Sequence, residues 1–393
     1  MYDFKLDKSI VEKIGFNPYY SVIQSELDEE IYINDDSFIN LAANNYLGLA
    51  NDKRLKKAAI DAINKYGLSL CGTPIATGYT DLFKAVEESI SSFVGLDDAI
   101  IFPSCYQANN GLFGALATEK DIILVDHYAH SSLIQGIKNT KSRISPFLHN
   151  DIKHLEKLFK SSSKYKNIIV VTESVFSTEG SIAPFNEMNE LCNKYNALLV
   201  VDDSHGIGVV GKSGRGVLEH SDTINFKGIY TASLGKALAN SGGAICGEKK
   251  IIEYLRYNIP HLIYSTAIIP SALGGIIKTI EIIKNEFSFL SEKMWDNKRI
   301  IEDALKGAGF NIVKGETPIN SIIGGDKETT LKIAKLFFDE KILVTPFIEP
   351  SVPPNKGVIR LIAQATFSET NLINIVKKIE KIGIKYNETL CNI

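Results

Sequence analysis

Short apolar runs rich in β-branched residues recur between residues 99 and 246 and predict buried strands. Between several of these runs, apolar positions return every three or four residues, as at Ile152, Leu155 and Phe159, which predicts amphipathic helices. Strands that are apolar on both faces and alternate with such helices favour a mostly parallel sheet covered on both sides. The predicted class is therefore α/β, with strands at Ala99–Phe102, Ile122–Asp126, Asn167–Glu173, Ala197–Asp203, Gly228–Ser233 and Gly243–Cys246.

The pattern differs on either side of this region. Near the N-terminus, a short helix from Lys8 to Ile14 and a hairpin of residues 31–33 and 38–39 form an extended arm. After Pro270 a helical pattern runs to about Gly307, with an expected break near residues 286–291. It is followed by a mixture of strands (310–313, 320–323, 342–344, 358–362) and helices (331–338, 372–379). We predict an N-terminal arm (1–45), a large domain (46–285) and a smaller α+β C-terminal domain (286–393).

Composition narrows the class of partner. A chain of 393 residues with a net charge of −3 and interleaved lysines and acids gives no electrostatic reason to expect nucleic acid or an anionic membrane. No stretch approaches the roughly 18 uninterrupted apolar residues of a membrane-spanning helix, and the first residues lack the apolar core of a signal peptide. The 5 cysteines form no CxxC pair or cysteine–histidine cluster. We expect a cytoplasmic protein with reduced thiols and no metal site.

Polar, titratable or small residues follow five of the predicted strands. Ligands bind at the carboxyl ends of strands in an open parallel sheet, so these positions are the first candidates for a site. Asp202 at one strand end and Lys236 just past another suit a pyridine cofactor, because a carboxylate holds a proton on the ring nitrogen and an amine forms a Schiff base with the aldehyde. Ser233 and the amides of the Ser104-Cys105-Tyr106 turn, which opens a helix, can hold a phosphate. The residues therefore point to pyridoxal 5'-phosphate (PLP).

One glycine motif suggests a different cofactor. Residues Gly206–Gly211 match GxGxxG and follow a strand, as in dinucleotide-binding proteins. Such a site needs a helix N-terminus directly after the motif, but residues 212–216 are glycine-rich and have no helical period. Asp202 and Asp203 would also repel a pyrophosphate. We interpret the motif as a tight loop.

The motifs together resemble the α-oxoamine synthases, a family of fold-type I PLP-dependent transferases. Members include 8-amino-7-oxononanoate synthase, 2-amino-3-ketobutyrate CoA ligase, 5-aminolevulinate synthase and serine palmitoyltransferase. The resemblance runs from about residue 35 to the end and keeps the order and spacing of the family's motifs. The matching stretches are Ala43–Leu49, Ser104–Asn109, Asp126–His130, Val175–Gly180, Val201–Gly206, Gly214–Gly216, Ser233–Leu238 and Tyr264–Thr266.

The resemblance implies a role for each matching residue. Lys236 would hold the cofactor and shuttle protons, Asp202 would pair with the pyridinium nitrogen, and His205 would bind the ring hydroxyl with Ser177 nearby. His130 would stack on the ring. Phosphate would be bound by Ser104, Cys105, Tyr106 and Ser233, and by Ser265 and Thr266 of the neighbouring subunit of a homodimer. Arg360 and Asn44 would bind the substrate carboxylate.

The activity implied is the condensation of an amino acid, glycine or alanine in the first place, with an acyl-CoA thioester. Carbon dioxide and CoA leave, and an α-amino ketone forms. Two positions depart from the family pattern: Pro74 stands where several members have an arginine, and Ala239 stands where a glycine is common. The alternatives are another fold-type I enzyme, such as an aminotransferase, and an inactive partner subunit. The first usually carries an Asn-Pro-Thr-Gly-like turn that this chain lacks, and the second typically loses the lysine.

Overall fold

The computed structural model describes residues 8–390 and contains two compact units. The large unit comprises Leu49–Phe176 and Ile182–Phe289. The small unit comprises the chain up to Gly48, the short segment Ser177–Ser181 and the chain from Leu290 onward. The N-terminal arm thus lies in the same unit as the C-terminal residues. The first seven residues of the predicted arm, and Cys391, lie outside the described range.

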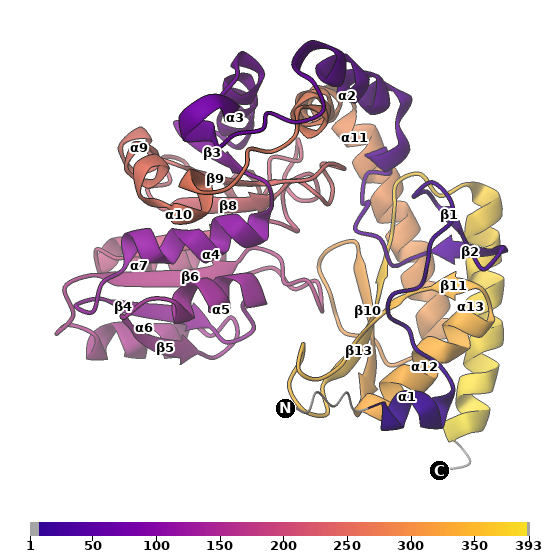
Figure 1. The fold of residues 1–393 in the computed structure, drawn as a ribbon. Coiled ribbons are helices and arrows are strands. Elements are labelled where there is room, and N and C mark those ends of the chain that lie inside the picture. Colours follow the sequence, from indigo (N-terminus) through magenta and orange to yellow (C-terminus); the bar gives the residue numbers. More distant parts are fainter. Residues whose placement is uncertain (1–7, 391–393) are drawn as a thin grey trace, which may run out of the picture. The chain divides into compact units, whose positions relative to one another are not determined.

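A seven-stranded sheet forms the centre of the large unit, in the order β3-β9-β8-β7-β6-β4-β5 (Figure 1). Strands β8, β7, β6, β4 and β5 are mutually parallel, and β9 is antiparallel to both of its neighbours. The prediction of a mostly parallel sheet is therefore confirmed. The bounds are β3 Asp98–Phe102, β4 Ile122–Asp126, β5 Arg143–Phe147, β6 Ile168–Glu173, β7 Leu198–Asp202, β8 Ile229–Ser233 and β9 Gly243–Gly247.

Helices pack on this sheet and bury its apolar faces. One core cluster joins Ile123 and Val171 of the strands to Leu112 and Leu133 of two helices. Side-chain caps fix where several helices begin; for example, Thr80 Oγ1 accepts a hydrogen bond from the amide of Phe83. The helices are α2 Lys53–Tyr66, α3 Asp81–Val94, α4 Cys105–Leu116, α5 Ser131–Lys138, α6 Ile152–Ser161, α7 Phe185–Lys194, α8 Val217–His220, α9 Lys249–Asn258 and α10 Pro260–Ile263, with short turns at Leu49–Asn51 and Pro74–Gly78.

The small unit holds two three-stranded sheets beside helices. The antiparallel hairpin of β1 (Glu30–Ile33) and β2 (Asp36–Asn40) is extended by β11 (Ile342–Leu343), and β13 (Gly357–Ile362) lies between β10 (Ile319–Gly325) and β12 (Thr345–Phe347). Phe310, Phe337, Ile359 and Ile379 belong to one buried cluster beneath them. The helices of this unit are α1 Ser9–Ile14, α12 Lys327–Asp339 and α13 Glu369–Leu390.

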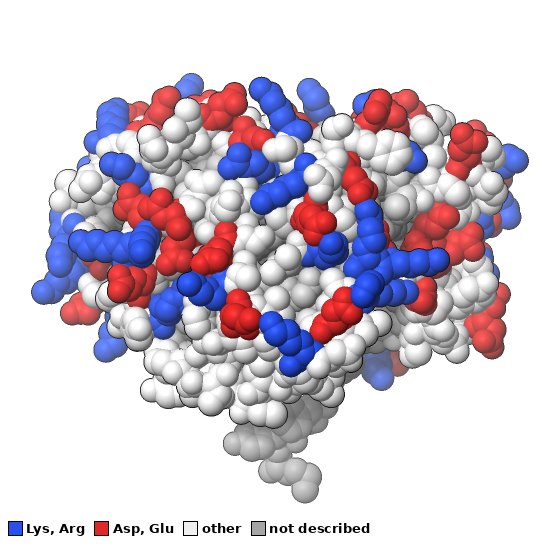
Figure 2. Space-filling model, turned by 90° about the horizontal axis from the view of Figure 1, so that it is seen from above, with Lys and Arg blue, Asp and Glu red and all other residues white. Residues whose placement is uncertain are grey.

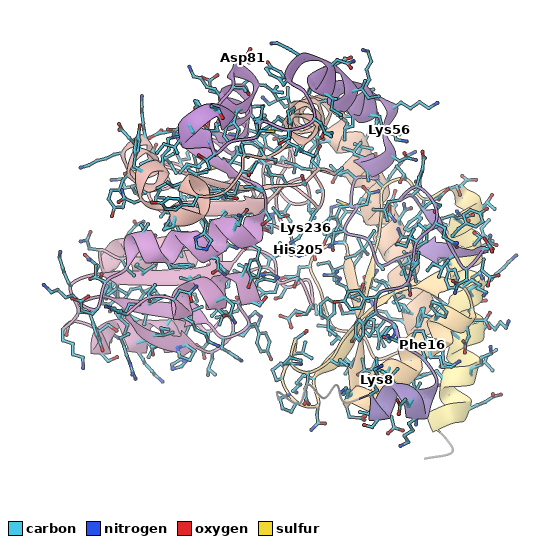
Figure 3. The ribbon with its side chains drawn as sticks, in the orientation of Figure 1. Lys8, Phe16, Lys56, Asp81, His205 and Lys236 are labelled. Carbon is cyan, nitrogen blue, oxygen red and sulfur yellow. The ribbon has the colours of Figure 1, made fainter. Side chains whose placement is uncertain are left out.

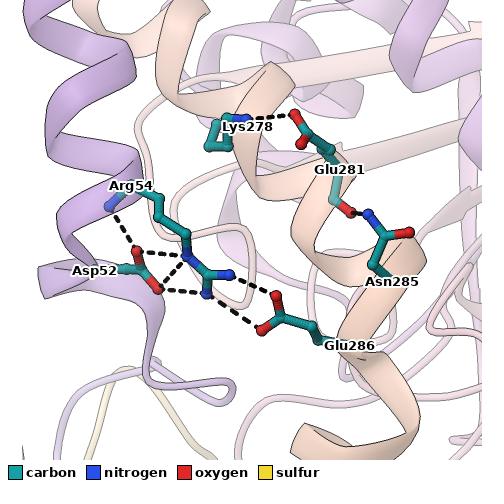
Figure 4. A network of polar contacts seen from close by, with 6 residues as sticks. All are labelled: Asp52, Arg54, Lys278, Glu281, Asn285 and Glu286. Atoms are coloured by element: carbon teal, nitrogen blue, oxygen red, sulfur yellow. Dashed lines mark hydrogen bonds and ion pairs between the residues drawn. The ribbon is translucent and has the colours of Figure 1, made fainter.

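The long helix α11 (Pro270–Gly307) begins in the large unit and ends in the small one. The predicted break near residues 286–291 is wrong, because Phe287 and Leu290 continue its buried face. Glu286 is a polar residue of this stretch that forms ion pairs with Arg54, which also binds the α2 N-cap Asp52 (Figure 4). The predicted strand at 310–313 is also wrong, since only Ile312 pairs, in a single bridge to Ile322.

Searches for a membrane-spanning helix and for a metal site cover the described residues. Among residues 8–390, no helix is long and apolar enough to cross a membrane. The same residues contain no group of three or more His, Cys, Asp or Glu side chains suited to a metal ion. On the face seen in Figure 2, basic and acidic side chains are interspersed.

Candidate active site

Asp202 ends β7 and is 4% exposed. Two donors hold its carboxylate: the side-chain amide of Asn109 donates to Oδ2 over 2.7 Å, and the backbone amide of Ser204 donates to Oδ1 over 2.9 Å. Asn109 comes from α4, one helical turn after the helix begins. The sheet and α4 therefore fix the direction in which this buried carboxylate points.

Lys236 lies on a short loop after β8, the strand next to β7. Three backbone hydrogen bonds close this loop: Leu234 N to Gly242 O (3.0 Å), Asn240 N to Leu234 O (3.0 Å) and Ala239 N to Lys236 O (2.9 Å). Ala239 has φ +55°, in the left-handed region that favours glycine. The family resemblance led us to expect a glycine at this position, and the left-handed φ of Ala239 is a conformation that a glycine adopts without strain. Figure 3 labels Lys236 and His205 at the same end of the sheet.

His130 caps the N-terminus of α5 and begins a chain of polar contacts that leads to Asp202. Its Nδ1 accepts a hydrogen bond from the amide of Ser132 and lies 2.7 Å from Ser132 Oγ. Asn109 Nδ2 donates to the same hydroxyl over 3.0 Å and also to Asp202. Desolvation, aided by the charge of Lys236 and opposed by that of Asp202, lowers the pKa of His130 below its usual value. The imidazole is therefore neutral at pH 7.

Two further buried carboxyl groups flank Asp202. Glu173 lies opposite Asp202 in the register of β6 and β7, and its carboxyl accepts a hydrogen bond from the backbone amide of His130. Burial and the charge of Asp202 raise the pKa of Glu173 well above its usual value. Burial likewise raises the pKa of Asp203 to about 7, although three hydrogen bonds act in the opposite direction.

The first turn of α4 presents backbone amides near the end of β8. Ser104 is the N-cap, and the amides of Cys105 and Tyr106 that follow it belong to the first turn, where no intrahelical acceptor exists. The amide of Ser233 donates to Ser204 Oγ over 2.8 Å, and that hydroxyl lies 3.5 Å from Cys105 Sγ. A Cβ at Gly243 would overlap the backbone of Cys105, so the glycine permits β9 to approach α4 closely. These contacts bring Ser104, Cys105, Tyr106 and Ser233 together.

The segment that includes Ser265 and Thr266 lies near the same helix. Ser265 Oγ accepts a hydrogen bond from the side-chain amide of Gln107, in the first turn of α4 of its own chain. Thr266 is exposed, and the adjacent Tyr264 is 84% exposed. The role of Ser265 and Thr266 toward a neighbouring subunit stays a prediction.

The small unit contains Arg360, Asn44 and Ser177. Arg360 lies on β13, is 6% exposed and donates from Nη1 to the carbonyl of Ser177 over 3.0 Å. Its guanidinium lies 4.9 Å from the centre of the Phe347 ring. Arg360 Nε and Asn44 Oδ1 are buried and have no hydrogen-bond partner in the described structure. Burial lowers the pKa of Arg360, an effect opposed by Tyr46. A buried cation with an unused donor is suited to an anionic ligand.

Comparison with known proteins gives the family. Residues 36–379 match the family model of class I and II aminotransferases. An 8-amino-7-oxononanoate synthase from Thermoanaerobacter pseudethanolicus is 33% identical over 96% of this chain and 95% of its own length. A serine palmitoyltransferase from Bacteroides ovatus is 32% identical over 93% of both chains. A 2-amino-3-ketobutyrate coenzyme A ligase from Salmonella typhimurium is 33% identical over 92% of both. The chain belongs to the α-oxoamine synthase family.

Solved structures agree with the fold expected of an α-oxoamine synthase. A serine palmitoyltransferase from S. paucimobilis, with a bound PLP–myriocin aldimine, superposes with a TM-score of 0.93 at 23% identity, over 97% of this chain and 96% of the other. The serine palmitoyltransferase of Sphingomonas wittichii gives a TM-score of 0.91 at 25% identity, over 97% and 98%. The predicted fold-type I PLP transferase fold is confirmed.

This synthase is PLP-dependent, and the donor set of its large unit fits the cofactor. Asp202 offers a carboxylate for a pyridinium nitrogen, Lys236 an amine for the aldehyde, and the first turn of α4 offers amides for a phosphate. Asn109, Ser132 and Ser204 support these groups and were not predicted as site residues. Asn109 stands in a motif quoted for the family, but nothing in the sequence indicates that its side chain reaches Asp202.

Proposed function

We propose that this α-oxoamine synthase joins an α-amino acid to the acyl group of an acyl-CoA thioester, with loss of carbon dioxide and CoA, to form an α-amino ketone. The observation that carries the proposal is the position of two residues on neighbouring strands. The buried Asp202 carboxylate ends β7, and Lys236 lies on the loop after β8. That pair suits PLP, which supplies an electron sink for a carbanion. The relatives described above are named as synthases, a transferase and a ligase, which gives no support to the aminotransferase alternative.

The residues assigned to the cofactor have complementary tasks in this proposal. Asp202 keeps a proton on the ring nitrogen, and Asn109 and Ser204 orient its carboxylate. Lys236 holds the cofactor and moves the proton at the substrate α-carbon. Neutral His130 stacks on the ring, and His205, with Ser177, binds the ring hydroxyl. Ser104, Cys105, Tyr106 and Ser233 bind the phosphate.

Arg360 and Asn44 bind the substrate carboxylate. Nε of Arg360 has no partner, and Nη1 is bonded to a carbonyl. The guanidinium can therefore offer a carboxylate two donors, Nε and a terminal nitrogen. Asn44 donates to the same carboxylate from the NH2 group of its side chain. We favour glycine or alanine, because none of the residues assigned here is available for a side-chain hydroxyl.

We further propose a cytoplasmic homodimer. Tyr264 is 84% exposed and Thr266 is also exposed, as expected of a segment that a second subunit covers. Ser265 and Thr266 would then act on the phosphate of the neighbouring subunit. The four described cysteines are free thiols, in keeping with a reducing compartment.

Thiol release from acyl-CoA tests this function. Purified enzyme with PLP is incubated with a matrix of amino acids and acyl-CoA chain lengths, and free CoA is measured. We expect release only when both substrates are present, most strongly with glycine or alanine. Transfer of the amino group to a keto acid without CoA release would overturn the proposal.

A further inference from the structure

The glycine-rich loop of residues 203–217 surrounds one buried carboxylate, that of Asp203. This residue directly follows Asp202 and is 0% exposed. Its Oδ1 accepts a hydrogen bond from Ser174 Oγ, and its Oδ2 accepts from Tyr230 OH (2.7 Å) and from the amide of Val217 (3.0 Å). The three donors come from the end of β6, from β8 and from the start of α8. One side chain therefore ties together three elements.

Two glycines of the loop, Gly206 and Gly216, are explained by this carboxylate. A Cβ at Gly206 would overlap Asp203 Oδ1, and a Cβ at Gly216 would overlap Oδ2. Any side chain at either position would displace the carboxylate. Val217 N, the first helical amide of α8, is already bonded to Asp203, and α8 is only 4 residues long. The first glycine of the GxGxxG pattern thus makes room for a carboxyl group of the protein itself, and no dinucleotide is needed to explain it.

The same loop contains His205 and contacts Ala237, the residue after Lys236. His205 lies inside the turn in which the amides of Gly206 and Ile207 donate to the carbonyl of Asp203, both over 3.0 Å. Farther along, a Cβ added to Gly208 would lie 2.7 Å from the Cβ of Ala237, the residue after Lys236. The backbone of Gly208 is fixed in turn by a 2.8 Å hydrogen bond to the carbonyl of Gly214.

We propose that Asp203 is a positioning residue, whose carboxylate closes this loop and thereby holds His205 and the Lys236 segment in place for PLP. The inference rests on the proposed function for the identity of the reaction, but it concerns residues of the large unit alone. An asparagine would change this network. Its amide oxygen can accept from Tyr230 and Val217, but its Nδ2 would have to donate to Ser174 Oγ, which reverses one of the three hydrogen bonds and removes the carboxylate.

Glu219 provides a matched control in the same loop. Its carboxylate also collects loop amides, those of Ser213 (2.9 Å) and Arg215 (3.2 Å). These contacts involve residues 213–215, where Arg215 Nε also donates to the carbonyl of Phe93. Glu219→Gln therefore loosens the loop without changing the turn that contains His205.

The test compares Asp203→Asn with Glu219→Gln in the PLP-loaded enzyme and in the apo protein. For Asp203→Asn we expect about 100-fold lower kcat, KM for the amino acid within about threefold, and about 10-fold weaker PLP binding to the apo protein. Glu219→Gln should keep kcat and PLP affinity within about twofold. Tyr230→Phe and Ser174→Ala, which each remove one donor, should give intermediate losses, and they replace Asp203→Asn if that variant does not fold.

Two results would overturn the proposal: wild-type kcat and PLP affinity in all three variants of the Asp203 network, or equal losses in Glu219→Gln, which would make the role one of loop stability alone. The PLP titration separates this inference from the proposed function. If wild-type enzyme released no CoA, the function would fail, whereas the effect of Asp203 on PLP affinity would still be measurable.

Discussion

Two sites of buried charged groups, one in each unit, differ in how completely the protein's own groups pair with them. In the large unit, Asp202 receives hydrogen bonds from Asn109 and Ser204, and Asp203 receives three. In the small unit, Arg360 donates one hydrogen bond to the carbonyl of Ser177 and lies against the ring of Phe347. Its Nε has no hydrogen-bond partner in the described structure. The carboxyl groups of Asp202 and Asp203 are held by the protein's own donors, whereas Arg360 keeps a donor that a ligand can use.

In the proposed function, this difference distinguishes a cofactor site from a substrate site. A cofactor that stays bound through many turnovers needs acceptors and donors fixed in advance. A substrate carboxylate enters and leaves, so its cation must remain available between turnovers. Substitutions at the Asp202 site should therefore affect kcat, and substitution of Arg360 should affect KM for the amino acid.

Asp202→Asn should give the largest effect in this comparison. Loss of the carboxylate removes the charge that keeps a proton on the ring nitrogen, so kcat for CoA release should fall about 100-fold or more while KM for the amino acid changes little. Steady-state kinetics at saturating PLP measures both. If Asp202→Asn changed KM alone, the proposed distinction between the two sites would be wrong.

Arg360→Leu should do the reverse. KM for the amino acid should rise about 10- to 100-fold, since two charge-assisted hydrogen bonds are lost. The free energy of unfolding should not fall by more than about 1 kcal/mol, because an incompletely paired buried cation is removed. Arg299→Leu, in the same unit but 64% exposed and paired with Asp296, serves as the control and should leave KM unchanged. A loss of about 3 kcal/mol or more in Arg360→Leu would show that Arg360 is structural.

Asn109→Ala should lower kcat about 10-fold, because one of the two donors that orient Asp202 is lost. Asn110 is the natural comparison: it follows on α4 but donates to the carbonyl of Ser132. Kinetics of Asn110→Ala should match wild type. Equal losses in both variants would mean that the helix, and not the contact with Asp202, is responsible.

His130 should give the smallest effect, seen in the pH dependence of stability of the apo protein. Its pKa in the folded state is lowered, so the unfolded chain takes up the proton first as pH falls below about 6.5. The stability contributed by this group is complete above that pH and declines as pH falls toward the lowered pKa. Denaturant unfolding of wild type and His130→Asn at pH 5 and pH 8 should show a smaller difference between the two pH values in the variant. Identical differences would contradict the lowered pKa.

Much of the large unit could be predicted from its apolar runs, because strands buried on both faces have a strong local signal. β5 could not, since Arg143–Phe147 at the sheet edge mixes exposed and buried positions. The continuity of α11 was missed because polar residues near 286 resemble a helix end, although Arg54 pairs with one of them. In the site, Asp202 and Lys236 were indicated by their place after strands. The contact of Asn109 with Asp202, and the burial of Arg360, depend on packing between segments far apart in the sequence.

Reduction of the PLP-loaded enzyme with sodium borohydride tests whether Lys236 carries the cofactor. We predict that the visible absorbance band of bound PLP disappears on reduction and that peptide mass spectrometry finds the reduced cofactor attached to Lys236. Lys236→Ala should show neither the band nor the attached mass. Covalent labelling of another lysine in wild type, or an unchanged band in Lys236→Ala, would show that Lys236 does not hold PLP.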